Sequence, residues 1–231
     1  MDKIFTKNIE HESAVKHVTG KAIYTDDISE PKNLLHAVIG YSNCSKGVIK
    51  KIDYKDVLSS EGVVDIITEK DIEGINDVGP IFKGDKIFTS KNIEYYGQPI
   101  FAVIAKTNNL AKKAALKVKI DLKISKPIVS IEEALKKKSF VLKPKHLTRG
   151  NIKDGFKRSD NFLKGKLYSG GQDHFYLEGQ IAMTIPQEDN NFLVYSSTQH
   201  PSETQQIIGK VLKQNYNSIH VIVRRIGGGF G

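Results

Sequence analysis

Polar side chains that could take part in chemistry gather in residues 170–178, which read GGQDHFYLE. The glycine pair allows another group to approach the backbone closely. Gln172 and His174 can each donate and accept hydrogen bonds without an obligatory charge. If the stretch is an extended strand, Gln172, His174 and Tyr176 share one face, which suits either the wall of a polar cavity or solvent. The residue types therefore leave a binding site and an ordinary strand start equally open.

A second candidate is the glycine-rich stretch 227–231, GGGFG, which follows an expected strand. Backbone N–H groups in such a turn can face an anion. The stretch matches neither the G-x-G-x-x-G nor the P-loop pattern, so a standard nucleotide site is not expected. Phe230 is a large apolar residue among glycines, and we expect it to pack against another group. Taken alone, the glycines also fit a flexible turn.

Other reactive residue types give weaker signals. Cys44 is the single cysteine and lies in a polar turn, so we interpret it as structural rather than as a catalytic thiol. His11 and His17 have no third ligand at a suitable spacing, so we expect no metal held by protein side chains. Asp26 and Asp27 are expected to cap a turn. The order of residues shows no Ser/His/Asp or Cys/His arrangement.

The net charge of +9 could indicate a nucleic-acid partner, but its distribution argues against one. Lysines are spread through every element, and the densest run, residues 136–138, lies where a linker is expected. We therefore favour a solvated surface over a binding patch. The N-terminus lacks the apolar core of a signal peptide, and no stretch reaches the roughly 18 apolar residues of a membrane span. The sequence predicts a soluble, cytoplasmic protein with no nucleic-acid or membrane partner.

The first half of the chain mixes strands and helices. Short apolar or β-branched runs predict strands at residues 34–41, 48–53, 63–67, 100–105 and 119–122. A short helix is expected at 54–58, and a longer one at 110–118 has an apolar stripe and a cap at Asn108 or Asn109. We therefore expect a compact α+β unit at 18–124, after a leader at 1–17 that has no clear period.

The second half begins with a polar connector at 125–165, rich in Lys, Pro and Gly, where Ser130 fits a capping box for one short helix. A further unit is expected from 166 to 231. Its predicted elements are strands at 180–185, 192–197 and 219–226 and a helix beginning at Pro201.

Several of these stretches resemble one family, the molybdenum hydroxylases. Residues 170–178 closely resemble the family's GGQ-E/D-HFYLE segment, and residues 225–231, RIGGGFG, resemble its R-x-GGGFG loop. Residues 18–28 look like the beginning of a bacterial xanthine dehydrogenase molybdenum-binding subunit. Residues 96–99, YGQP, before an apolar strand, are similar to the family's hammerhead domain. The motifs occur in one order over nearly the whole chain, which makes them far more specific than any one alone.

The resemblance implies an α+β fold: an aldehyde oxidase/xanthine dehydrogenase α/β hammerhead domain followed by the beginning of a molybdopterin-binding α+β domain. It also implies a molybdenum–molybdopterin cofactor held by non-covalent contacts, with no protein metal ligand. Gln172 falls on the glutamine that hydrogen-bonds an oxo ligand of the metal. Gly229 and Phe230 fall on the loop whose backbone approaches the metal. The family hydroxylates purines (hypoxanthine and xanthine to urate) with oxygen from water. Electrons pass to 2Fe–2S clusters and FAD, which lie on a partner subunit in split bacterial enzymes.

The chain departs from the family in length, because the family's molybdenum subunit is several times longer. The carboxylate base, the substrate-binding residues and most cofactor contacts lie beyond the GGGFG loop. Glu178 matches a different glutamate, so we expect no catalytic residue in this chain. We expect the chain alone to be inactive, as a truncated product, one piece of a split gene or a fragment. Its expected partners are the remaining molybdenum-binding part, an FAD/iron–sulfur subunit and a purine substrate.

Two other interpretations stay open. One is a non-catalytic hammerhead module that scaffolds a partner or binds a polyanion through its lysines. The other is a relative within the same family that oxidises aldehydes or carbon monoxide.

Overall fold

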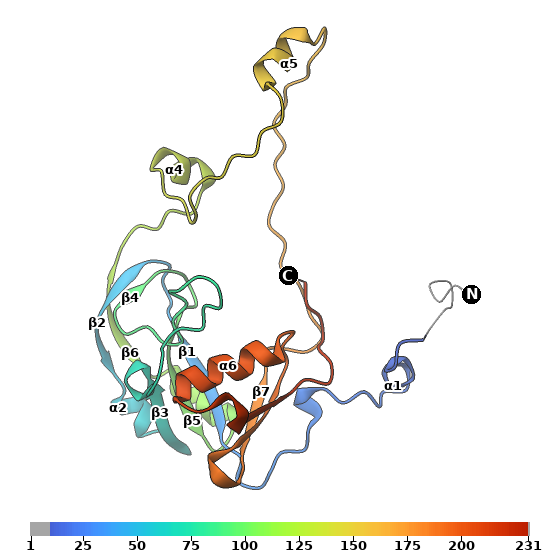
Figure 1. Cartoon of the computed structure of the whole chain (residues 1–231). Coiled ribbons are helices and arrows are strands. Elements are labelled where there is room, and N and C mark those ends of the chain that lie inside the picture. Colours follow the sequence, from blue (N-terminus) through green and yellow to red (C-terminus); the bar gives the residue numbers. More distant parts are fainter. Residues whose placement is uncertain (1–9, 231) are drawn as a thin grey trace, which may run out of the picture. The chain divides into compact units, whose positions relative to one another are not determined.

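A computed structural model describes residues 10–230 of the chain. The chain divides into two compact units, one made of Met1–Ser125 with Phe175–Gly231 and the other of Lys126–His174 (Figure 1). Part of the predicted leader, residues 1–9, lies outside the described residues. Helices and strands are mixed throughout, so the predicted α+β class is confirmed.

Two three-stranded sheets form the first part of the larger unit. One has the order β1-β5-β3, with β1 at His36–Tyr41, β5 at Pro99–Ala105 and β3 at Val63–Thr68, all antiparallel. The other has the order β4-β2-β6, with β4 at Asn92–Ile93, β2 at Gly47–Asp53 and β6 at Lys119–Ile124. Helix α3, Asn108–Ala115, packs on the first sheet against β1 and β5. Five of these strands match the predicted runs, and β4 is too short to show a sequence pattern.

The core of this part lies around β5, whose continuous apolar run is explained by burial on both faces. Phe101 and Val103 are fully buried in it. Gly40 of β1 lies opposite Phe101, and a Cβ at this position would come within 2.2 Å of the Phe101 ring. The Tyr54 ring meets the edge of the same ring, with centroids 5.3 Å apart. A small residue at position 40 is therefore what admits the large one at 101.

The predicted cap of α3 is wrong by one or two residues. Thr107, not Asn108 or Asn109, is the N-cap, and its Oγ1 accepts a hydrogen bond from Leu110 N at 3.3 Å. Thr107 has the extended backbone (φ −143°, ψ 154°) that an N-cap requires, whereas both asparagines already belong to the helix.

Residues after 175 build a third sheet with the order β7-β8-β9. Strand β7 (Ala182–Pro186) is antiparallel to β8 (Phe192–Ser196), and β9 (Ile219–Ile222) is parallel to β8. Helix α6, Pro201–Leu212, makes the crossover between β8 and β9, and it begins at the predicted proline. The predicted strand 219–226 is too long, because the backbone leaves the sheet after Ile222.

Several short elements were not predicted or were predicted wrongly. Residues 170–178 contain no strand, so the expected alternation of faces does not apply to them. Helix α1, Ala14–Val18, lies in the leader, and its single turn is too short to show an apolar period. The remaining short helices are α2 (Lys55–Leu58), which matches the prediction, and the 3₁₀ turns η2 (Thr25–Asp27), η3 (Glu69–Asp71), η4 (Glu188–Asn190) and η5 (Tyr216–Ser218).

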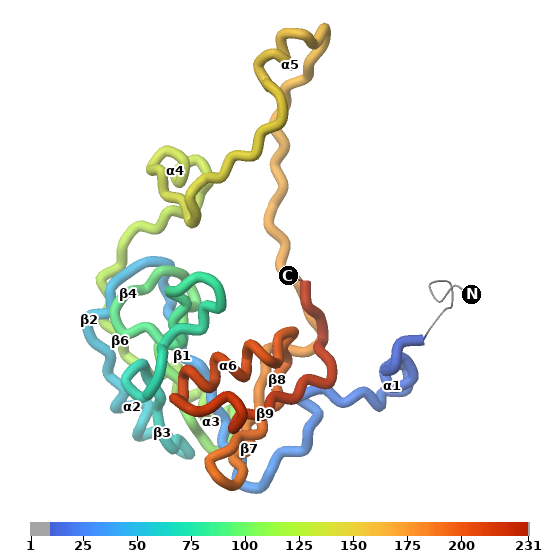
Figure 2. The backbone as a smooth tube through the Cα atoms, viewed as in Figure 1, coloured from blue at the N-terminus to red at the C-terminus, as the bar shows by residue number. Residues whose placement is uncertain are grey.

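The smaller unit, Lys126–His174, contains two short helices joined by irregular backbone (Figure 2). Helix α4, Ile131–Lys136, has the predicted N-cap, since Ser130 Oγ accepts from Glu133 N at 3.2 Å. The predicted capping box is only half formed, because the Glu133 carboxylate pairs with Lys137 Nζ at 2.7 Å. Helix α5, Ile152–Arg158, was not predicted, and Asn151 caps it. The unit contains twelve Lys and Arg against five Asp and Glu, so it holds most of the chain's net positive charge.

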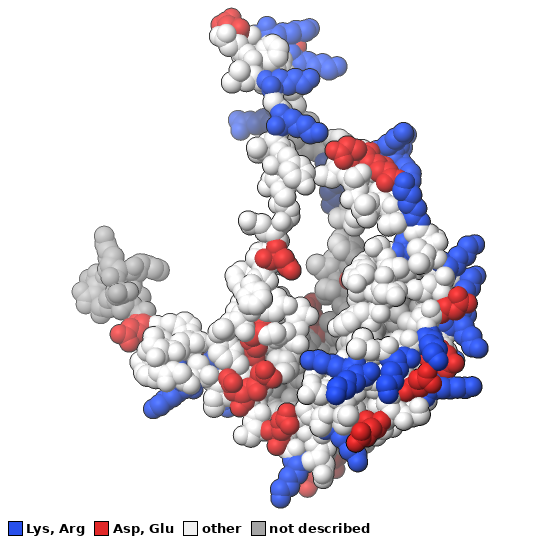
Figure 3. Space-filling view, turned by 180° about the vertical axis from the view of Figure 1, so that it is seen from behind, with Lys and Arg blue, Asp and Glu red and all other residues white. Residues whose placement is uncertain are grey.

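Charged side chains of both signs are interleaved on the face shown in Figure 3. Within the described residues, no helix is both long and apolar enough to cross a membrane.

Candidate functional site

In the larger unit, the end of the stretch 170–178 contacts the start of the GGGFG loop. Leu177 N donates a hydrogen bond to Gly227 O at 3.0 Å. A Cβ on Gly227 would lie 2.0 Å from Glu178 N, so a side chain there would collide with backbone. Glycine at 227 is therefore what allows the end of the HFYLE segment to lie against the start of the GGGFG loop.

The next residues of the loop are also closely surrounded. Gly228 has a φ of 152°, in a region that disfavours other residues, and a Cβ there would lie 2.4 Å from the Phe230 ring. A Cβ on Gly229 would lie 1.6 Å from Gln199 Nε2. Phe230 is 56% exposed. The loop thus has backbone and a neutral amide at its surface, next to a partly exposed ring.

Gln172 belongs to the smaller unit, whereas Gly229 and Phe230 belong to the larger one. Its side chain is exposed and its backbone is irregular. The predicted site residues therefore lie in two separate units, and their roles toward a cofactor stay predictions.

Glu178 is the most buried acidic residue of this region, with 8% of its surface exposed. Its Oε1 accepts a hydrogen bond from Thr25 N at 2.7 Å. Its Oε2 is buried and has no hydrogen-bond partner among the described residues. The sequence did not single out this contact, because the two residues are 153 positions apart and no local pattern links them.

Arg225 makes a parallel contact. Its Nη1 donates a short hydrogen bond to Ile23 O, while its Nε is buried without a partner among the described residues. Glu178 thus holds the backbone N–H of Thr25, and Arg225 holds the backbone carbonyl of Ile23. The intervening Tyr24 N donates to Asp27 Oδ2 at 2.9 Å, so Asp27 of the predicted acid pair caps the turn.

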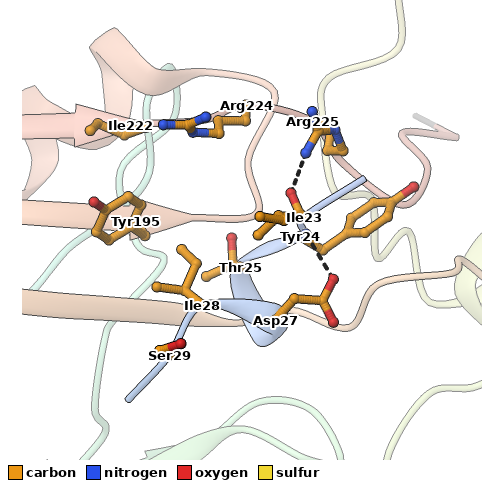
Figure 4. Close-up of a pocket in the computed structure, with 10 residues that line it drawn as sticks. All are labelled: Ile23, Tyr24, Thr25, Asp27, Ile28, Ser29, Tyr195, Ile222, Arg224 and Arg225. Carbon is orange, nitrogen blue, oxygen red and sulfur yellow. Dashed lines mark hydrogen bonds between the residues drawn. The ribbon is translucent and has the colours of Figure 1, made fainter. Parts of the chain in front are cut away.

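A pocket of about 380 Å³ lies beside these contacts (Figure 4). Apolar side chains of Ile23, Ile28 and Ile222 and the ring of Tyr195 form part of its lining. Figure 4 shows Arg224 and Arg225 following β9 along one side of it. Guanidinium groups next to apolar walls suit an acidic group attached to an apolar body.

Among residues 10–230, no group of three or more His, Cys, Asp or Glu side chains could hold a metal ion. Cys44 is buried and not bonded to another cysteine. A cofactor that is held by hydrogen bonds and backbone contacts would depend instead on groups such as the Gln172 amide and the loop 227–230.

Two protein-family models together match most of the chain. Residues 19–126 match the model described as "Aldehyde oxidase and xanthine dehydrogenase, a/b hammerhead domain". Residues 133–231 match the "Molybdopterin cofactor-binding domain" model. A hammerhead domain followed by the beginning of a molybdenum-cofactor domain is thus confirmed as the fold class.

Curated relatives align with nearly the full length of the chain. A xanthine dehydrogenase from Dictyostelium discoideum is 38% identical over 226 residues, which are 98% of this chain and 16% of that protein. Aldehyde oxidase 2 from Macaca fascicularis is 37% identical over 225 residues, 96% of this chain and 16% of that protein. The chain therefore spans about one sixth of the length of these relatives.

Solved structures agree. The aldehyde oxidoreductase from Desulfovibrio gigas superposes with a TM-score of 0.81 at 25% identity, covering 95% of this chain and 26% of that one. Quinoline 2-oxidoreductase from Pseudomonas putida 86 gives a TM-score of 0.81 at 20% identity, covering 96% and 30%, and supports the fold alone. Together, the fold and the two motifs define a hammerhead domain and the beginning of a molybdopterin cofactor-binding domain. The chain belongs to the molybdenum hydroxylase family of xanthine dehydrogenases and aldehyde oxidases.

Proposed function

We propose that this chain is the N-terminal portion of the molybdenum-binding part of a purine hydroxylase, which converts hypoxanthine and xanthine to urate with oxygen from water. The observation that carries the proposal is the contact between the two family motifs. Leu177 N donates to Gly227 O, so the GGQDHFYLE and GGGFG stretches meet although 49 residues separate these two positions in the sequence. Two motifs that converge in space are stronger support for a site than either motif in the sequence alone.

The residues present fit part of a molybdenum–molybdopterin site. A Cβ on Gly229 would fill the space beside Gln199 Nε2, so glycine keeps loop backbone and a neutral amide together there. The exposed Gln172 amide can donate a hydrogen bond without adding a charge. When bound, the cofactor supplies the redox chemistry of the hydroxylation. In this proposal Gln172 would hydrogen-bond the oxo group of the bound cofactor, and Gly229 and Phe230 would bring loop backbone to the cofactor.

The 231 residues are proposed to need partners for activity, since they span about one sixth of the relatives' length. The remaining molybdenum-binding part would supply the base, the substrate contacts and most cofactor contacts. 2Fe–2S clusters and FAD on a further subunit would accept the electrons. The smaller unit offers a surface for such a partner, because several large apolar side chains there are more than half exposed: Val141, Leu147, Phe156, Phe162, Leu163 and Leu167. We also propose a cytoplasmic location, which fractionation of cells would test.

The experiment is a hydroxylation assay on the tagged chain, isolated both alone and in the complex that it forms in its own cells. The complex is expected to form urate from xanthine with an artificial electron acceptor, and the isolated chain is expected to form none. A complex that forms no urate from xanthine or hypoxanthine would contradict the purine assignment. Urate formed by the isolated chain would contradict the need for partners.

Aldehyde oxidation is the second candidate, because an aldehyde oxidase and a xanthine dehydrogenase match the chain equally well, at 37% and 38% identity. The same complex should therefore be assayed with an aromatic aldehyde. Turnover of the aldehyde without turnover of xanthine would replace the purine proposal with this one. A carbon monoxide substrate is tested in the same way with the gas.

A non-catalytic scaffold or polyanion-binding module is the remaining alternative, and the lysine-rich smaller unit is the observation that favours it. Titration of the chain with a DNA duplex at increasing salt distinguishes it. Binding that weakens steeply as salt rises would support phosphate recognition. No binding at low salt would exclude polyanion binding.

A further inference from the structure

Glu178 is buried without an ionic partner. A buried glutamate is uncommon unless it is paired. Glu178 is 8% exposed, and no Lys, Arg or His within residues 10–230 forms an ion pair with it. Its hydrogen bond comes from a backbone group, Thr25 N, at 2.7 Å. The carboxylate therefore has a backbone N–H, not a cation, as its hydrogen-bond partner.

The bond connects two segments that are far apart in the sequence. Thr25 is the first residue of η2, and Tyr24 before it is extended, with a ψ of 174°. Tyr24 N is already used by Asp27, so Thr25 N is the group that faces Glu178. The downstream end of the HFYLE segment is thereby fixed to the turn that precedes β1.

The same position of Glu178 also determines where the glycine loop can lie. Leu177, the residue before it, donates its N–H to Gly227 O at 3.0 Å. The backbone N of Glu178 would lie 2.0 Å from a Cβ on Gly227. A shift of Glu178 would therefore move the surface on which Gly227 rests, and with it the following Gly229 and Phe230.

We propose that Glu178 is a positioning residue: its carboxylate, bonded to Thr25 N, holds the backbone of 177–178 in the place that orders the GGGFG loop. That this loop then faces a molybdenum cofactor rests on the proposed function, but the ordering itself does not. Glu178 is no candidate for the catalytic base, because its carboxylate is buried against backbone.

Hydrogen exchange of the isotopically labelled chain, without any cofactor, tests this ordering. The reporter is the amide of Leu177, which exchanges only when its bond to Gly227 O opens. The buried strands β5 and β8 report any general loss of stability. Because no cofactor is needed, the result stands apart from the hydroxylation assay that tests the proposed function.

Four variants separate the hydrogen bond from other effects. Glu178→Ala removes the acceptor, and Glu178→Gln keeps an acceptor oxygen without the charge. Thr25→Pro removes the donor N–H together with the threonine hydroxyl, and proline suits the first position of a helical turn after an extended residue. Glu188→Ala is the matched control, since Glu188 is an exposed acid of the same unit whose side chain makes no hydrogen bond or ion pair in the described residues.

Glu178→Ala and Thr25→Pro are each expected to speed exchange at Leu177 about tenfold while β5 and β8 keep their rates. Combining the two should add nothing, because both remove one bond. Glu178→Gln and Glu188→Ala should leave exchange at Leu177 unchanged. Unchanged exchange in Glu178→Ala, equal acceleration in β5 and β8, or a Glu178→Gln variant that behaves like Glu178→Ala would each overturn the proposal.

Discussion

Arg225 donates a hydrogen bond from Nη1 to Ile23 O across 202 positions of sequence. The guanidinium belongs to the residues just before the GGGFG loop, and the carbonyl belongs to the segment before the hammerhead sheets. A second hydrogen bond, from Thr25 N to Glu178 Oε1, joins the same early segment to the end of the HFYLE segment. The segment 23–25 is therefore part of the support of the candidate site.

Replacing Arg225 with methionine should loosen this support. The variant keeps an apolar stem but leaves Ile23 O without its donor, and we expect a loss of about 1.5 kcal/mol in the free energy of unfolding. Urea titration of the chain measures it. Arg224→Met is the control, because Arg224 is exposed and forms no hydrogen bond or ion pair within the described residues. Equal losses in the two variants would contradict a specific role for Arg225.

Gly227→Ala should separate the two motifs. The added Cβ would meet Glu178 N at 2.0 Å, and backbone cannot yield as a flexible side chain does. We expect a destabilisation of about 1–3 kcal/mol, typical of overpacking, together with loss of protection at the Leu177 amide. Gly179→Ala is the matched control, since a Cβ at 179 meets nothing within 4 Å. If Gly227→Ala were as stable as Gly179→Ala, the close approach would be disproved.

Gly40→Ala tests the core of the hammerhead part. A Cβ there would lie 2.2 Å from the ring of the fully buried Phe101. We expect the variant to lose about 1–3 kcal/mol in thermal or urea unfolding. The double variant Gly40→Ala with Phe101→Leu should lose less than the sum of the single changes, because the smaller side chain makes room for the methyl group. Additive losses would show that the two positions do not compete for space.

Tyr54 should titrate late. Burial, with the nearby Asp71 carboxylate, raises the pKa of Tyr54 to about 12. The phenolate forms more easily in the unfolded chain, where the pKa of tyrosine is about 10. Stability from Tyr54 is therefore complete below pH 10 and decreases between pH 10 and 12. Absorbance at alkaline pH, compared with Tyr54→Phe, follows this step. A last ionisation near pH 10 in the folded protein would contradict the burial.

Local patterns in the sequence predicted much of the fold. The β5 run, the apolar stripe of α3 and Pro201 at the start of α6 each follow from residues close to one another. Elements decided by distant partners were missed. The stretch 170–178 has a strand-like composition but no strand, and the expected strand 219–226 ends at Ile222. After Ile222 the chain hydrogen-bonds outside the sheet instead, through Arg225 to Ile23 O and through Gly227 O to Leu177 N.

The candidate site shows the same division. Gln172, Gly229 and Phe230 were proposed from motifs, and such motifs are visible in a single sequence. Thr25 contacts Glu178, and Gln199 lies beside Gly229, through contacts that involve distant parts of the chain. No spacing rule brings Thr25 to Glu178, because only the folded backbone places the N–H of one beside the carboxylate of the other.

The central claim, that this chain contributes to a molybdenum–molybdopterin site, is tested most directly by the content of the complex isolated from its own cells. Metal analysis and the fluorescence of the oxidised pterin should find molybdenum and pterin in equal amounts, and Gln172→Ala should reduce both relative to the control Gln180→Ala, another exposed glutamine. A stable complex that contains neither molybdenum nor pterin would contradict the claim.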